Sequence, residues 1–213
     1  MDFLRKHWFD LGGFFGLVIL GIVFFISPQQ SAYQSLMWLS LSALFFHQVE
    51  EYRMPGTFPG MINRVMFHSK WPDRYPLNSN TALIINVALG WTVYLLAAIT
   101  GEQFVWLGMA CILVSLGNII AHTFIFNLKG RTIYNAGLVT SWLCLAPCVF
   151  FYFKIVSEEV SSSVTDYLIG IPLGIVINFF GVFKPIIWLA DHNTIFDFKN
   201  RHLLPDDRKK VNL

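Results

Sequence analysis

Six long apolar stretches alternate with shorter polar connections along this chain of 213 residues. Each stretch approaches the roughly 20 mostly apolar residues that a helix needs to cross the hydrocarbon core of a bilayer. The stretches are residues 9–27, 32–52, 80–99, 103–125, 135–153 and 166–190. The pattern therefore predicts an all-α fold, a polytopic membrane bundle of six transmembrane helices.

A shorter helix is predicted in the long connection between the second and third spans. Pro59 can open a helix, and apolar residues recur at spacings of three and four over residues 58–69. The apolar stripe consists of Phe58, Met61, Ile62, Val65 and Met66. We expect this amphipathic helix to lie along the cytoplasmic membrane surface, with His68 at the edge of the stripe.

The composition agrees with a membrane protein and excludes an ordinary soluble domain. Hydrophobic residues make up 55% of the chain and charged residues only 13%, and the mean hydropathy is +0.55. No linker divides the chain, so we expect one integral membrane domain over residues 1–213, in which residues 194–213 form a juxtamembrane cytoplasmic tail. His7 and His202 are expected in the solvated flanks. A net charge of +2 is too small and too scattered for a nucleic-acid surface.

The basic residues predict the orientation, because short cytoplasmic loops carry an excess of Lys and Arg. With the N-terminus inside, nearly all of them fall on the cytoplasmic side, and only Lys154 lies clearly outside. The cytoplasmic group is Arg5, Lys6, Arg53, Arg64, Lys70, Arg74, Lys129, Arg131, Lys199, Arg201, Arg208, Lys209 and Lys210. Both termini are therefore expected in the cytoplasm, and in a bacterium the membrane would be the inner, plasma membrane.

Polar side chains inside apolar spans are costly and often mark functional sites. The second span ends with His47, Glu50 and Glu51, which spacings of three and four place on one helix face. Two carboxylates at the C-terminal end of a helix are unfavourable beside its partial negative charge, and a bound cation would offset that cost.

Two further spans run in the same direction and also end in polar residues. Asn118 and His122, four residues apart, end the fourth span, and Asp191 and His192 end the sixth. We expect these groups at one depth in the membrane, together with His68. The predicted ligands are His47, Glu50, Glu51, His68, Asn118, His122, Asp191 and His192.

Imidazole and carboxylate groups together favour zinc or iron, whereas calcium and magnesium sites use oxygen ligands almost alone. The predicted ligands outnumber the four that one tetrahedral zinc ion needs. The expected cofactor is therefore one zinc ion or two, bridged by a carboxylate, with iron as the alternative.

The sequence His47-Gln48-Val49-Glu50-Glu51 resembles the signature of the HXXEE family of integral membrane proteins. Gly117-Asn118 and His122 are similar to the second polar motif of that family, and the resemblance extends over most of the chain. It implies a membrane enzyme built around these polar residues, and it specifies no reaction.

From these residues we expect a metal-dependent integral membrane enzyme, a zinc hydrolase. Glu50 or Glu51 would accept a proton from the attacking water, whose pKa the zinc lowers, and the other would bind the metal. A position at the cytoplasmic leaflet, with the helix over residues 58–69 as a lid, favours a lipid or another amphiphilic small molecule as substrate. The expected partners are this substrate and membrane lipids.

Other interpretations remain open. The same ligands would suit a di-iron oxidase or hydroxylase, although membrane desaturases contain more histidine. An ion or metal transporter would also use such groups, but the outer halves of the spans are nearly uncharged. In a structural protein, residues 47–51 would form a charged face paired with Arg53 or Arg64, and Asn118 with His122 would connect two helices through hydrogen bonds.

Overall fold

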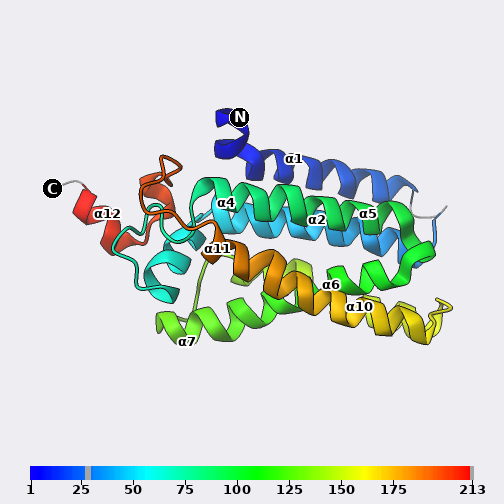
Figure 1. Cartoon of the computed structure of the whole chain (residues 1–213). Helices are drawn as coiled ribbons and strands as arrows, with labels where there is room; N and C mark the ends of the chain where they lie inside the picture. Colours follow the sequence, from blue (N-terminus) through cyan, green and yellow to red (C-terminus); the bar gives the residue numbers. More distant parts are fainter. Residues whose placement is uncertain (27–29, 212–213) are drawn as a thin grey trace.

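The computed structural model describes residues 1–26 and 30–211, and these residues form helices and loops but no β-strand. The end of the first expected span at residue 27 lies outside the described residues, as do the side chains of Lys209 and Lys210. The long helices run side by side in one bundle, and the start of α1 (Asp2–Ile26) and α12 (Pro205–Val211) lie at the same end of it (Figure 1). The predicted all-α fold is confirmed.

The second helix, α2 (Ala32–Tyr52), is the centre of the bundle. It begins at Ser31, whose hydroxyl accepts a hydrogen bond from the Gln34 backbone N–H at 3.1 Å. It packs against α1, α5 (Thr92–Thr100) and α9 (Ala146–Glu158). Its polar residues Ser40, Ser42, His47, Gln48, Glu50 and Glu51 are all buried. The polar face of α2 is therefore covered by other helices.

Residues 79–130 form one uninterrupted helical stretch that folds back on itself. The outgoing arm is α4 (Ser79–Leu83), η3 (Ile84–Trp91) and α5, and the returning arm is η4 (Gly101–Phe104), α6 (Val105–Ile120), η5 (Ala121–Ile125) and α7 (Phe126–Gly130). The chain reverses at Gly101, whose φ of +53° few residues other than glycine adopt. Asn78 begins the outgoing arm, because its side chain accepts hydrogen bonds from the Asn80 and Thr81 N–H groups.

The remaining long helices follow in the order expected from the sequence. They are α8 (Leu138–Thr140), η6 (Ser141–Leu145) and α9, then α10 (Val164–Val176), η7 (Ile177–Phe183) and α11 (Lys184–Trp188). α10 approaches α6 closely at Gly174, where a Cβ atom would lie only 2.7 Å from Leu113 Cβ. The absence of a side chain on Gly174 allows this approach. Asn178 donates a hydrogen bond to the Leu113 carbonyl at 3.1 Å, so it connects the two helices.

Within the described residues, four helices are long and apolar enough to cross a membrane, not the six expected from the sequence. They are Asp2–Phe25, Ser79–Gly130, Leu138–Glu158 and Val164–Trp188. The expected second span, α2, is not among them because its buried polar residues lower its hydropathy. The third and fourth expected spans are the two arms of Ser79–Gly130, and they form one continuous stretch.

The predicted helix in the connection after α2 is present but shorter than expected. α3 (Phe58–Gly60) continues as the π-helical segment η2 (Met61–Met66), and Met61 and Ile62 are buried. A Cβ atom on Gly60 would lie 2.8 Å from the His202 carbonyl oxygen. This helix therefore packs beneath the C-terminal segment of the chain, and only glycine allows so close an approach.

The C-terminal segment is folded onto the bundle, which corrects the expectation that His202 lies in a solvated flank. Phe198, His202 and Leu203 are buried. His202 Nδ1 lies 3.0 Å from the Gly56 carbonyl oxygen, and Arg201 Nε donates to His202 Nε2 at 3.2 Å. Since Nε2 accepts, Nδ1 carries the proton and donates to Gly56, so His202 is neutral.

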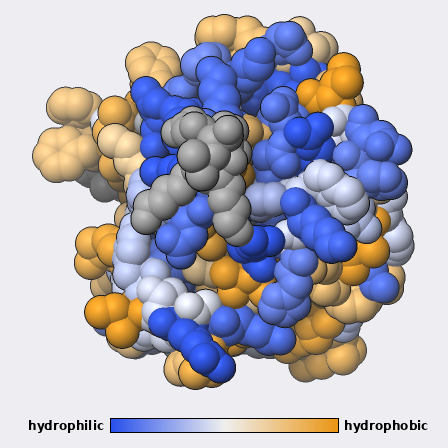
Figure 2. All heavy atoms as spheres, turned by 90° about the vertical axis from the view of Figure 1, so that its left-hand side faces the viewer, coloured by the Kyte–Doolittle hydropathy of each residue, from blue (hydrophilic) through white to orange (hydrophobic). Residues whose placement is uncertain are grey.

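Charged and polar residues gather at one end of the bundle, formed by residues 2–8, 53–78, 126–137 and 189–208, which we call the polar end. Hydrophilic side chains cover most of this face (Figure 2). The sides of the bundle expose large apolar residues, among them Phe14, Leu143, Leu168 and Ile175. Such a division, with an apolar belt and a polar end, is compatible with an integral membrane protein.

Acidification should release the C-terminal segment. Burial lowers the pKa of His202 to about 4, and Arg201, Lys199 and Arg208 disfavour the charged form further. The docked segment is fully stable above the ordinary histidine pKa of about 6.5 and loses about 2 kcal/mol by pH 5, because only the released imidazole gains a proton. Hydrogen exchange of residues 198–208 should therefore speed up between pH 7 and pH 5. His202→Asn should remove this pH dependence, and an unchanged dependence would contradict the assignment.

Candidate metal centre

Three ionisable side chains from two helices of the bundle converge on one point. His47 and Glu51 lie one helical turn apart on α2, and His122 lies on η5, in the second half of the returning arm of residues 79–130. Glu51 Oε1 lies 3.6 Å from His47 Nε2 and 3.3 Å from His122 Nε2. One ligand atom from each of the three residues lies within 4.8 Å of the other two.

All three side chains are buried. The exposed fraction is 1% for His47, 0% for His122 and 5% for Glu51, so no bulk water solvates the group. The Nε2 atoms of both histidines have no hydrogen-bond partner among the described residues. Buried polar atoms almost always have a partner, so these two orphaned nitrogens point to a ligand.

The tautomer of His47 is set by Thr140 and Glu50. The Thr140 hydroxyl donates to Glu50 Oε2 at 2.6 Å, since a carboxylate can only accept. The same hydroxyl oxygen lies 3.0 Å from His47 Nδ1 and must accept there. His47 therefore carries its proton on Nδ1 and directs the bare lone pair of Nε2 toward Glu51.

The tautomer of His122 is set by Asn135 in the same way. The Asn135 amide nitrogen donates to the His122 carbonyl oxygen and to Asn127 Oδ1, both at 2.8 Å. This fixes Asn135 Oδ1 as an acceptor, and it lies 2.5 Å from His122 Nδ1. His122 Nδ1 therefore donates, and its Nε2 also presents a bare lone pair to Glu51.

Three electron pairs with no proton between them repel one another unless a cation lies among them. Two ligand atoms bound about 2.0–2.1 Å from a tetrahedral zinc ion lie about 3.3–3.4 Å apart, which agrees with the separation between Glu51 Oε1 and His122 Nε2 of 3.3 Å. Histidine ligands of metals characteristically donate their other ring nitrogen to a neighbouring acceptor, as both histidines do here. The residues therefore fit a metal ion.

The backbone around His122 supports this geometry. His122 lies in η5, a π-helical segment, and such local widenings of a helix are frequent at functional sites. Gly137, with a φ of +112°, lies in close contact with the imidazole, since a Cβ atom there would lie 2.2 Å from His122 Cε1. Phe58 stacks on the ring at a centroid distance of 5.7 Å. The imidazole is therefore held in one orientation.

Glu50 lies outside the convergence point and serves a different role from its neighbour. Its carboxylate accepts hydrogen bonds from the Val139 and Thr140 N–H groups at 3.3 and 2.7 Å, and so caps the helix that begins with α8. It also accepts from the Tyr134 hydroxyl at 3.0 Å. Burial and the Glu50 charge raise the pKa of Tyr134 to about 12, which keeps that hydroxyl a donor.

Asn118 borders the site without completing it. Its side chain lies beside His47, but its amide donates to the Val114 carbonyl at 3.1 Å. Asn118 therefore forms no hydrogen bond with His47 Nε2. A cavity of about 70 Å³ is lined by Asn118, His47 and Glu51 and otherwise mainly by apolar groups. The apolar part of the lining is Leu44, Phe58, Leu77, Ile85, Val114, Val182 and Ile186.

The structure does not bring His68, Asp191 or His192 to this group, which corrects the larger ligand set expected from the sequence. α11 ends at Trp188, and the chain then leaves the bundle in an irregular loop. His192 is exposed there and its ring lies 5.2 Å from that of Trp71. His68 is exposed beyond the end of η2.

Asn135, Gly137 and Thr140 complete the site, and the sequence pattern had not indicated them. They precede or open the fifth expected span, whose helix starts at Leu138 (α8) and not at the expected residue 135. A cluster of small and polar residues at the start of an apolar stretch was the available signal, but short polar residues are common at such positions.

Replacing Thr140 with valine should weaken metal binding about 10- to 100-fold, because valine keeps the shape but removes the acceptor for His47 Nδ1. The loss of hydrogen bonds to His47 and Glu50 should also lower the free energy of unfolding by about 1–3 kcal/mol. Metal titration of the purified variant measures the first effect. Thr165→Val, at an exposed position in α10, is the matched control, and equal affinities for the two variants would refute the role of the Thr140 hydroxyl.

Comparison with known proteins connects this site to a family. The family model described as "Protein of unknown function with HXXEE motif" matches residues 38–152, more than half of the chain. The match contains all three converging ligands, and also Thr140 and Asn135. No curated protein and no solved structure matches the chain.

Proposed function

Because the chain belongs to the family of proteins of unknown function with an HXXEE motif, we propose its function from the site itself: a metal-dependent membrane enzyme with one metal ion on His47, Glu51 and His122. The observation that carries this proposal is the pair of buried, proton-free Nε2 atoms directed at one carboxylate oxygen. A dinuclear site is not supported, since the residues that would hold a second ion lie elsewhere.

Zinc hydrolysis is the chemistry that we favour. Catalytic zinc sites combine three protein ligands, for instance two histidines and a glutamate, with an open fourth position, whereas structural zinc sites are closed by four. When bound, zinc lowers the pKa of a coordinated water and polarises a carbonyl group. Of the two expected proton acceptors, Glu51 borders the cavity, and Glu50 is occupied by its donors. The second oxygen of Glu51 is therefore the proposed proton acceptor.

A non-haem iron enzyme is the second candidate, because two histidines and one carboxylate also form the facial triad of iron oxygenases. It would use the same three residues and the same cavity. A transporter is disfavoured, since the converging ligands lie near the end of α2 and in η5, close to the polar end, and the opposite halves of the long helices carry few charged groups.

We propose a lipid or another amphiphile as the substrate. The cavity beside the ligands is mostly apolar, and its polar wall consists of Gln48, Asn86 and Asn118. Gln48 is held by hydrogen bonds from Trp91 Nε1 at 2.8 Å and to Asn86 Oδ1 at 3.0 Å. At about 70 Å³ the cavity has room for the reacting end of such a substrate and not for its apolar chain, and the amides would orient that end at the metal ligands.

We further propose that both arms of residues 79–130 and the central helix α2 cross the bilayer, and that the polar end faces the cytoplasm. Neighbouring helices cover the polar face of α2, which makes a span of low hydropathy tolerable. Nearly all Lys and Arg residues belong to the polar end, as cytoplasmic loops require.

Metal analysis of protein purified in detergent, followed by assays in mixed micelles, tests the proposal. One zinc ion per chain, with release of fatty acid from a phospholipid or an acylglycerol, is the expected result. Stoichiometric iron with substrate-dependent oxygen uptake would favour the second candidate. A chain that binds neither metal, as isolated or after addition of the ion, would refute both. Asp191→Asn is the control and should retain both metal and activity.

A further inference from the structure

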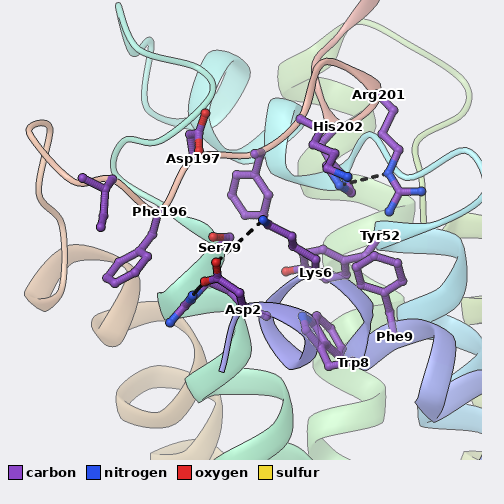
Figure 3. Close-up of a pocket in the computed structure, with 14 residues that line it drawn as sticks. Asp2, Lys6, Trp8, Phe9, Tyr52, Ser79, Phe196, Asp197, Arg201 and His202 are labelled. Carbon is purple, nitrogen blue, oxygen red and sulfur yellow. Dashed lines mark hydrogen bonds and ion pairs between the residues drawn. The ribbon is translucent and has the colours of Figure 1, made fainter.

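A second pocket lies at the polar end, away from the metal ligands. The first turns of α1 form one wall and the C-terminal segment of residues 195–202 forms the other, with Tyr52 and Ser79 also lining it (Figure 3). Its volume is about 300 Å³, at the lower limit of pockets that hold small ligands. It is larger than the cavity beside His47 and Glu51.

The lining of this pocket is positively charged. Four cations line it, Arg5, Lys6, Lys199 and Arg201, against two carboxylates, Asp2 and Asp197. His202 adds no charge, since its pKa is lowered to about 4 by burial. Two positive charges in excess thus face one pocket in a chain whose total net charge is +2.

Part of this charge is not neutralised within the described residues. Asp2 binds Arg5 at 2.7 Å and lies 4.0 Å from Lys6, whereas Lys199 and Arg201 form no ion pair there. Asp10, whose charge acts on Arg201, is already paired with Arg53 at 2.9 Å. Burial and the neighbouring Arg53 lower the pKa of Arg201 below its usual value.

Aromatic rings hold both guanidinium groups in place. Arg5 lies over the Phe196 ring, 4.2 Å from its centroid, and Arg201 lies over Phe9 at 5.2 Å. Arg5 donates through Nε to Asn80 at 3.4 Å and through Nη1 to Asp2, and Arg201 donates through Nε to His202. The donors left for a ligand are therefore chiefly those on Nη2 of Arg5 and on both Nη atoms of Arg201. The pocket thus offers fixed donors on two walls and a flexible ammonium group, Lys6, between them.

We propose that this pocket binds a phosphate group, with Arg201, Lys6 and Arg5 as its contacts. The phosphate of an anionic phospholipid is the favoured source. The pocket opens beside α1, whose residues Phe3, Phe14 and Leu17 are 67%, 61% and 63% exposed and present an apolar surface to acyl chains. A soluble phosphate compound would use the same donors.

Thermal unfolding of the detergent-purified full chain tests this proposal. The probes are phosphatidic acid or phosphatidylglycerol in mixed micelles, phosphatidylcholine in the same micelles, and inorganic phosphate. Stabilisation by the anionic lipids alone assigns the pocket to a lipid headgroup, and stabilisation by inorganic phosphate as well assigns it to phosphate from either source. Stabilisation by none of the phosphate probes would overturn the proposal.

Variants separate this pocket from general attraction of anions. Arg201→Gln should weaken lipid binding about tenfold, which corresponds to about 1.4 kcal/mol, and Lys6→Gln, at a more exposed position, should act in the same direction without disturbing the fold. Arg201→Lys should recover part of the affinity. Lys129→Gln removes one charge from the same end outside the pocket, and a loss equal to that of Arg201→Gln would refute a specific site.

Discussion

Glu51→Gln should abolish stoichiometric metal binding and leave the fold intact. Glutamine has nearly the shape of glutamate, but it lacks the charge that offsets the metal ion, and its amide N–H can donate to the free Nε2 of His47 or His122. We expect the metal affinity to fall more than about 100-fold, which is a larger loss than removing the hydrogen-bond partner of a metal ligand causes. Metal analysis and calorimetry on the purified variant measure this change.

The opposite effect on the metal-free protein makes this prediction specific. In the presence of a chelator the variant should unfold at the same temperature as the wild type or a higher one, because a donor now satisfies a buried acceptor. Glu158→Gln, at an exposed position in α9, is the matched control and should change neither property. A Glu51→Gln protein that retains full metal content would exclude Glu51 as a ligand.

Gly137→Ala should disrupt the metal site by displacing the imidazole of His122. The added Cβ atom would approach His122 Cε1 to 2.2 Å, and the φ of +112° is unfavourable for alanine. Backbone strain and displacement of a fully buried imidazole should together lower the free energy of unfolding by about 3 kcal/mol or more. Metal affinity should fall with it, as measured by titration on whatever fraction remains folded.

Gly21→Ala provides the matched control for that substitution. Gly21 lies in α1, and a Cβ atom there meets no other atom within 4 Å. This variant should be as stable as the wild type or slightly more so, since alanine favours a helix. If Gly137→Ala were as stable and bound metal as well as Gly21→Ala, the close packing of Gly137 against His122 would be refuted.

Helical spacing and topology together could predict the three ligands that converge. The separation of four between His47 and Glu51 fixes them on one face of a helix, and two parallel helices bring His122 to the same depth. The same argument assigned Asp191 and His192 to the site wrongly. It required the last helix to continue to residue 190, whereas α11 ends at Trp188 and the loop beyond it leaves the bundle.

The different roles of Glu50 and Glu51 could not be predicted, although both lie at helical spacings from His47. Adjacent residues on a helix point about 100° apart, so one faces η5 and the other faces the start of α8. Which direction holds a metal partner and which holds N–H donors depends on residues about 90 positions later in the sequence. Tertiary packing, which no local pattern encodes, decides this.

Hydropathy alone leaves α2 out of the helices that are apolar enough to cross a membrane, for a related reason. A hydropathy pattern treats each stretch as though lipid surrounded it, but α2 is surrounded by helices and can be polar. The π-helical segments η3, η5, η6 and η7 could not be predicted either, since they share no pattern of proline or glycine.

The burial of α2 has a consequence for how the chain is made. In the arrangement that we propose, α2 is too polar to partition into lipid alone, since acidic groups disfavour insertion of an isolated helix. The helix made immediately before it is α1, which packs along its length. Gly12, Gly13 and Gly16 of α1 lie against Phe45, Val49 and Phe46 of α2. The two helices should therefore enter the membrane as one hairpin, and the translocation machinery should release α2 only after later helices have covered its acidic face.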